Sequence, residues 1–140
     1  MQACKILLAD DDPDDRSIIM DAMEVMNAGG WMKFAENGQK VLDILEEEFG
    51  ADNTPQLIVL DLNMPKMNGT QTLGHLKRDD RFKNIPVIIY STSINPLEKE
   101  KCMTLGAHSY MTKPVSFTES VERARAFLTF CEPQNVDNLQ

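Results

Sequence analysis

The side chains best suited to chemistry in this sequence are three aspartates that directly follow short apolar runs. Asp10 and Asp11 follow the run at residues 5–9, and Asp61 follows the run at residues 57–60. Runs this short, and apolar almost throughout, predict strands that are buried on both faces of a parallel sheet. Because open α/β sheets bind ligands outside the carboxyl ends of their strands, we expect the three carboxylates to face one crevice.

Converging carboxylates repel one another, and the repulsion raises the pKa of at least one of them. A divalent cation would relieve this repulsion. Mg²⁺ takes oxygen ligands in an octahedron and usually keeps some of its waters, so one or two carboxylates with a backbone carbonyl form a reasonable protein share. The sequence therefore indicates a magnesium site formed by Asp10, Asp11 and Asp61.

Two further side chains could bind a phosphoryl group at the same edge of the sheet. Ser91 follows the apolar run at residues 86–90, and Lys113 follows the run at residues 109–112. A hydroxyl, an ammonium and a metal ion can share the negative charge of phosphoryl oxygens. Since an aspartate carboxylate can act as a nucleophile toward phosphorus, this set of residues predicts phosphoryl transfer onto an aspartate.

The elements that must position these residues alternate regularly along the chain. Strands are predicted at residues 5–9, 32–35, 57–60, 86–90 and 109–112, and helices at about 13–28, 38–49, 69–78, 96–105 and 117–128. Five strands that alternate with five helices predict an α/β fold with helices on both faces of the sheet. We expect a doubly wound, flavodoxin-like parallel sheet with strand order 2-1-3-4-5, in which strands one and three are neighbours.

Local signals set the helix ends. Asp12 followed by Pro13 is typical of a helix start. Asp14 and Asp15 lie in the first turn, where the helix dipole stabilises negative charge. We therefore interpret these three aspartates as capping, solvated residues with no part in the site. Gly29-Gly30 is expected to end this helix. In the last helix, apolar residues at helical spacing predict one packed face: Phe117, Val121, Ala124 and Leu128.

Composition excludes several classes of protein. The chain has 140 residues, 42% of them apolar and 26% charged, which suits one globular domain. The net charge of −8 argues against a nucleic-acid surface. The sequence has neither a signal peptide nor an apolar segment long enough to cross a membrane, so we expect a cytoplasmic protein. The three cysteines are widely spaced and predict neither a disulfide framework nor a zinc site.

Taken together, these motifs resemble the receiver domain of two-component response regulators. The resemblance covers residues 5–130 and rests on the Asp10-Asp11 pair, the segment at 60–69 around Asp61, Ser91, and Lys113-Pro114. It implies a receiver domain at residues 1–131, followed by a polar tail at residues 132–140. The connectors at residues 50–56 and 79–84, with the segment at 85–93, also resemble the small stand-alone regulators that partner bacterial phytochromes.

The resemblance implies a role for each site residue. Asp61 would accept a phosphoryl group from a sensor histidine kinase, and Ser91 and Lys113 would bind that group. Asp11, Asp61 and the backbone carbonyl of Asn63 would bind Mg²⁺ directly, with Asp10 acting partly through water. Such a protein catalyses only its own Mg²⁺-dependent phosphorylation and dephosphorylation.

The resemblance also implies a conformational switch and a route for output. Ser91 would move toward the phosphoryl group while Tyr110 turns inward, and the Lys113–Pro114 peptide bond would be cis. Because no output domain follows residue 130, the protein would act by binding an unidentified downstream partner. The expected surface is the fourth helix, fifth strand and fifth helix, through which a homodimer could also form.

Two other functions fit the same residues less well. A small phosphohydrolase with an aspartate nucleophile usually carries a second acid two residues later, where this chain has Asn63. An adaptor that works without phosphorylation would have no need of the complete site. Turnover of phosphorylated metabolites would indicate the phosphohydrolase. Partner binding that is independent of both Mg²⁺ and the phosphate mimic beryllofluoride would indicate the adaptor.

Overall fold

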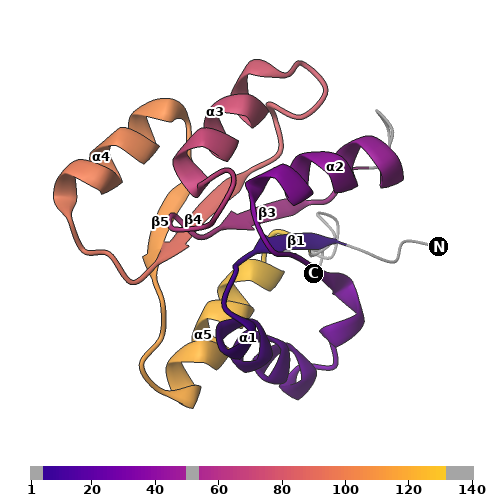
Figure 1. Ribbon diagram of the computed structural model, residues 1–140. Helices are drawn as coiled ribbons and strands as arrows, with labels where there is room; N and C mark the ends of the chain where they lie inside the picture. The colour runs from indigo at the N-terminus through magenta and orange to yellow at the C-terminus, as the bar shows by residue number, and fades with distance from the viewer. Residues whose placement is uncertain (1–4, 50–53, 132–140) are drawn as a thin grey trace, which may run out of the picture.

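The structure is a computed structural model that describes residues 5–49 and 54–131. Its centre is a five-stranded parallel sheet with strand order β2-β1-β3-β4-β5, which confirms the predicted topology (Figure 1). The strands are β1 (Ile6–Ala9), β2 (Met32–Ala35), β3 (Leu57–Leu60), β4 (Val87–Ser91) and β5 (Ser109–Thr112). The helices are α1 (Pro13–Val25), α2 (Gly38–Glu48), α3 (Gly69–Arg78), α4 (Pro96–Leu105) and α5 (Phe117–Leu128), with a short 3₁₀ turn at Gly29–Trp31.

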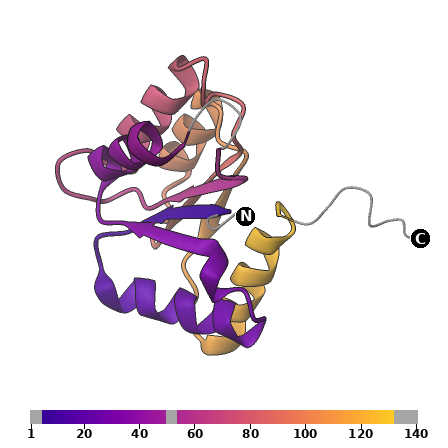
Figure 2. The same cartoon turned by 90° about the vertical axis from the view of Figure 1, so that its right-hand side faces the viewer.

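The helices cover the sheet from both sides. Figures 1 and 2 show α2, α3 and α4 over one face, and α1 and α5 side by side over the other. Because side chains alternate along a strand, each central strand supplies both cores. In β1, Leu7 and Ala9 join the core under α2, α3 and α4, whereas Ile6 and Leu8 join the core under α1 and α5. All four are buried, as predicted for a strand covered on both faces.

Side-chain caps hold the helix starts where the sequence placed them. The side chains of Asp12, Asn37, Asn68, Asn95 and Ser116 each accept a hydrogen bond from a backbone N–H in the first turn of the helix that follows. Asn68 and Gln71 form a complete capping box at α3. These caps matter for function because α1, α3, α4 and α5 each follow a strand end that carries a candidate site residue, namely Asp10, Asp61, Ser91 and Lys113.

The end of α1 differs from the prediction. The helix stops at Val25, and the chain leaves it through Asn27, which has a left-handed backbone at φ 56°. Asparagine tolerates this conformation at a helix end almost as glycine does. Gly29 and Gly30 lie in the following 3₁₀ turn, so the prediction that they terminate the helix was wrong.

The packed face of α5 also differs from the prediction. Ala124 is buried as expected, but Phe117 is 52% exposed and the fully buried aromatic residue of this helix is Phe127. The ring of Phe127 packs edge-on against Tyr90 of β4, with 5.5 Å between the ring centroids. The helix therefore turns the face of residues 120, 124 and 127 toward the sheet.

Within residues 5–49 and 54–131, no helix combines the length and the apolar character needed to cross a membrane. The predicted polar tail at 132–140 lies outside the described residues, as does Cys4.

Candidate functional site

The carboxyl ends of four strands meet at one edge of the sheet, and backbone pairing continues past them. Asp10 N–H donates to the carbonyl of Ala35 at 3.0 Å, and Asp61 N–H donates to the carbonyl of Ala9 at 3.0 Å. Lys113 N–H donates to the carbonyl of Ser91 at 2.9 Å. Since these residues extend the sheet, their positions are set by the register of the strands and not by a flexible loop.

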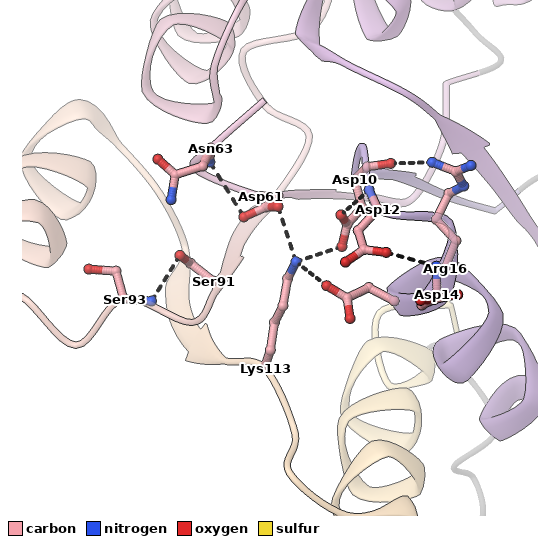
Figure 3. A network of polar contacts seen from close by, with 10 residues as sticks. Asp10, Asp12, Asp14, Arg16, Asp61, Asn63, Ser91, Ser93 and Lys113 are labelled. Atoms are coloured by element: carbon pink, nitrogen blue, oxygen red, sulfur yellow. Dashed lines mark hydrogen bonds and ion pairs between the residues drawn. The ribbon is translucent and has the colours of Figure 1, made fainter. Parts of the chain in front are cut away.

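Lys113 joins the acidic side chains of this edge. Its Nζ lies 2.8 Å from Asp10 Oδ2, 3.0 Å from Asp61 Oδ2 and 2.7 Å from Asp15 Oδ2. Figure 3 shows the Lys113 ammonium between Asp10 and Asp61, with the carboxylates turned toward it. The side chain of Lys113 is 10% exposed, and those of Asp10 and Asp61 are 1% and 8% exposed. The sequence-predicted acids and lysine therefore meet in one partly buried cluster.

Burial and charge shift two pKa values in this cluster. Burial raises the pKa of the Asp10 carboxyl, and the nearby Lys113 ammonium offsets only part of that shift. Burial alone would lower the pKa of Lys113, but Asp10, Asp15 and Asp61 together outweigh it and the net shift is upward. Lys113 therefore holds its proton more tightly than a free lysine does, whereas ionisation of Asp10 is less favourable than in water.

The residues fit the predicted divalent cation. Carboxylate oxygens of Asp10, Asp11 and Asp61 all lie within 4.8 Å of one another. Asp10 Oδ2 is buried, and its close partner among the described residues is the Lys113 ammonium at 2.8 Å. Asp11 is exposed, which leaves its carboxylate accessible to an incoming hydrated ion. A buried carboxylate oxygen beside two further carboxylates is the oxygen-rich environment that Mg²⁺ takes.

Ser91 and Tyr110 lie at the same edge but do not contact the acidic cluster. Ser91 is fully buried, and its Oγ accepts a hydrogen bond from Ser93 N–H at 3.1 Å. The Tyr110 hydroxyl donates to the carbonyl of Ser93 at 2.9 Å. Both side chains therefore hold the segment between β4 and α4. In Figure 3, Ser91 and Lys113 come from neighbouring strands beside Asp61.

The segment after β3 is fixed against Asp61 by Gly69 and Asn63. Gly69 N–H donates to the carbonyl of Leu62 at 3.1 Å, and Asn63 N–H points at Asp61 Oδ1 from 3.5 Å. Lys66 takes a left-handed backbone at φ 68°, which turns the chain toward α3. The Lys113–Pro114 peptide bond is trans, so the expected cis form was wrong for this structure. The trans form is the lower in energy for most bonds before proline.

Two contributors to the site were missed in the sequence. Asp15 was interpreted as a solvated helix residue, yet it makes the shortest of the three Lys113 contacts. Arg16 Nη1 donates to the backbone carbonyl of Asp10 at 2.7 Å. Both lie in the first turn or so of α1, which begins immediately after the Asp10-Asp11 pair. A helix that starts at the site directs one side of its first turn toward the site. The signal in the sequence was therefore the position of both residues, about one helical turn after the Asp10-Asp11 pair.

Comparison with known proteins agrees with the geometry. A family model described as "Response regulator receiver domain" matches residues 6–125. A probable methanogenesis regulatory protein, FilR2 of Methanothrix harundinacea, is 32% identical over 115 residues, covering 81% of this chain and 74% of that protein. The transcriptional regulatory protein CpxR of Escherichia coli K12 is 34% identical and covers 96% of this chain, which spans 55% of CpxR.

Solved structures give the same result. The phosphorylated cyanobacterial phytochrome response regulator RcpA has a TM-score of 0.79 and 28% identity, covering 93% of this chain and 94% of that one. The bacteriophytochrome response regulator RtBRR has a TM-score of 0.73 and 30% identity, covering 91% and 78%. The matched family model spans every element from β1 to most of α5, and the chain therefore belongs to the response regulator receiver domain family of two-component signalling proteins.

Proposed function

We propose that Asp61 is the phosphoacceptor of this receiver domain. Phosphorylation by a kinase is general for the family, and the assignment of the residue comes from this chain. The observation that carries the proposal is the position of Asp61, at the carboxyl end of the central strand β3 and paired at 3.0 Å with Lys113. Of the clustered acids, Asp61 is also the one placed between the strands that carry Asp10 and Ser91.

The chain's own side chains have defined tasks in such a transfer. An Asp61 carboxylate oxygen attacks phosphorus, and the bond from phosphorus to the donor breaks as the donor leaves with its electron pair. Lys113, kept protonated by its acidic neighbours, neutralises charge on the phosphoryl oxygens without giving up a proton. The Ser91 hydroxyl, whose oxygen here accepts a hydrogen bond from Ser93 N–H, would donate its own O–H to a phosphoryl oxygen.

Receiver domains bind Mg²⁺ or Mn²⁺ at an acidic cluster, and the related response regulator Rcp1 is described in an Mn²⁺-bound form. In this chain Asp11, Asp61 and the backbone carbonyl of Asn63 would bind Mg²⁺ directly, with Asp10 acting partly through water. When bound, the ion would neutralise charge on the phosphoryl group and on the carboxylates. The carboxylate oxygens of Asp10, Asp11 and Asp61, which lie within 4.8 Å of one another, support this assignment.

The switch would run from Ser91 to Tyr110 and then to the surface of α4, β5 and α5. Ser93 supports this route, because its backbone N–H and carbonyl contact Ser91 and Tyr110 respectively. Beside Ser93, Ile94 and Leu97 are 83% and 72% exposed, so large apolar side chains are available to a partner. A downstream protein or a second copy of this chain would bind here.

A sensor histidine kinase is the partner that a receiver domain implies, and the similarity to RcpA and RtBRR favours a phytochrome-type kinase. The receiver domain would comprise residues 1–131 and act in the cytoplasm, without binding nucleic acid or membrane. Signalling proteins of this kind act on themselves and do not turn over a metabolite.

The phosphoacceptor is tested by incubating the protein with acetyl phosphate and Mg²⁺ and measuring its intact mass. We expect the wild type to gain one phosphoryl group and Asp61→Asn to gain none. Asp80→Asn is the matched control, because Asp80 is an exposed aspartate in the connector after α3 and pairs only with Lys83 among the described residues. Equal labelling of Asp61→Asn and the wild type would exclude Asp61.

A further inference from the structure

The first turn of α1 carries two neighbouring acidic residues that face different surroundings. Asp15 Oδ2 lies 2.7 Å from Lys113 Nζ, and the Asp15 side chain is 32% exposed. Asp14 is exposed and makes no ion pair within the described part of the chain. The two residues share a charge, a helix turn and nearly the same distance from the helix N-terminus. They differ in their contact with Lys113, so that contact is the feature to explain.

The Lys113 ammonium has three N–H donors and three carboxylates within 3.0 Å. Two of these carboxylates have other tasks in the proposed function. Asp10 and Asp61 belong to the group of acids that could hold a metal ion, and Asp61 would also carry the phosphoryl group. Asp15 is not part of that group of three acids. Asp15 is therefore the carboxylate beside Lys113 that has no other task in the proposed function.

We propose that Asp15 is a positioning residue for phosphoryl transfer: it holds the Lys113 ammonium at the carboxyl end of β5, aimed at Asp61. This inference rests on the proposed function of Asp61 and Lys113. A long lysine side chain has considerable rotamer freedom, and a short ion pair at its end removes much of it. The hydrogen bond from Lys113 Nζ to Asp15 joins two charged groups, which makes it one of the stronger kinds.

The matched pair of variants is Asp15→Asn and Asp14→Asn. Each removes one negative charge from the same helix turn, so general effects on the local field and on the helix dipole are shared. Loss of the Lys113 contact belongs to Asp15→Asn alone. Because misplacing a catalytic group by a small distance slows a reaction substantially, we expect this variant to lose about tenfold in its maximal rate of phosphorylation.

The experiment measures phosphorylation by acetyl phosphate at saturating Mg²⁺ as a function of acetyl phosphate concentration. We expect the maximal rate of Asp15→Asn to fall while its half-saturating concentration stays close to that of the wild type. Asp14→Asn should match the wild type in both. In parallel, ¹⁵N NMR of the Lys113 ammonium in metal-free protein should show faster proton exchange in Asp15→Asn than in Asp14→Asn, a change independent of phosphorylation.

The outcomes separate the two proposals. Equal maximal rates in Asp15→Asn and Asp14→Asn, or equal exchange of the Lys113 ammonium, would overturn the role of Asp15. A rise in the half-saturating concentration alone would overturn it as well, since that would place Asp15 in donor binding. If the wild type is not labelled at Asp61, the proposed function fails, and the NMR comparison still decides whether Asp15 holds Lys113.

Discussion

Gly69, the first residue of α3, lies directly against the backbone carbonyl of Asp61. A Cβ atom added to Gly69 would lie 2.2 Å from the backbone carbonyl oxygen of Asp61 and 2.9 Å from the carbon of the same carbonyl. Neither backbone atom can move aside without shifting the end of β3, because Asp61 N–H donates a hydrogen bond to the carbonyl of Ala9. The candidate phosphoacceptor is therefore held in place partly by the absence of a side chain eight residues later.

The first prediction follows from this contact. Gly69→Ala should destabilise the protein by about 1–3 kcal/mol, the usual cost of forcing an extra group into a packed region. It should also slow labelling of Asp61, because the strand end must shift. Urea unfolding measures the first effect and intact mass the second. Gly30→Ala is the control, since a Cβ there meets nothing within 4 Å, and a Gly69→Ala variant as stable as Gly30→Ala would contradict the prediction.

Much of the site could be predicted from sequence because it lies on strand ends. Short apolar runs locate strands, and the first polar residue after each run must emerge at the carboxyl edge of a parallel sheet. This reasoning placed Asp10, Asp61 and Lys113 together, and the structure brings their side chains into contact. The helix starts were equally accessible, because residues such as Asn95 followed by Pro96 act locally.

The failures concern relations that local patterns do not encode. Asp14 and Asp15 have the same side chain, and only the direction of α1 relative to β5 decides which one meets Lys113. Similarly, Phe117 and Phe127 both fit an apolar helical stripe, and the packing of α5 against Tyr90 buries the second. The early end of α1 at Val25 depended on Asn27 adopting a left-handed backbone, which asparagine permits but does not require.

The second prediction concerns the stability of the metal-free protein and its dependence on pH. The pKa of Asp10 is raised in the fold, so the folded state binds a proton there more tightly than the unfolded state does. Asp10 therefore contributes most to stability below its unfolded pKa of 3.8, and the contribution is lost as pH rises through its folded value. At neutral pH, Asp10→Asn should be more stable than the wild type by about 0.5–2 kcal/mol, as is common when strain at a functional site is relieved.

Urea unfolding at several pH values, without divalent ions, tests this prediction. The stability advantage of Asp10→Asn should shrink as pH falls, because the wild-type carboxyl then becomes neutral as well. Asp80→Asn is a suitable control, since Asp80 is exposed. An Asp10→Asn variant less stable than the wild type at neutral pH would mean that the Lys113 ion pair outweighs the burial of Asp10.

The third prediction separates metal binding from phosphoryl transfer. Lys113→Met removes the cation that now lies within 3.0 Å of three carboxylates. Mg²⁺ should then bind about fivefold more tightly, since removing one partly screened positive charge is worth about 1 kcal/mol. Labelling of Asp61 should nevertheless fall sharply, because the phosphoryl oxygens lose their ammonium partner.

Calorimetric titration with Mg²⁺ and intact mass after acetyl phosphate treatment give the two readouts. Lys83→Met is the matched control, because Lys83 is half-exposed and pairs with Asp80 far from the site. Weaker Mg²⁺ binding by Lys113→Met would show that Lys113 supports the metal site, whereas unchanged labelling would remove it from the proposed reaction.

The fourth prediction concerns the proposed switch. Tyr110→Phe removes the hydroxyl that donates to the Ser93 carbonyl at 2.9 Å but keeps the ring. Ser91 still accepts a hydrogen bond from Ser93 N–H, so labelling of Asp61 should stay within about twofold of the wild type, as expected for loss of one ordinary hydrogen bond outside the reacting group. In this variant, phosphorylation should shift the backbone NMR signals of residues 92–95 less than it does in the wild type.

Thr112→Val, a change on the same strand, is the control and should show the same phosphorylation-induced shifts as the wild type. If Tyr110→Phe also leaves them intact, then Tyr110 does not transmit the change at Ser91, and the route to the exposed Ile94 and Leu97 must lie through the backbone of Ser93 alone.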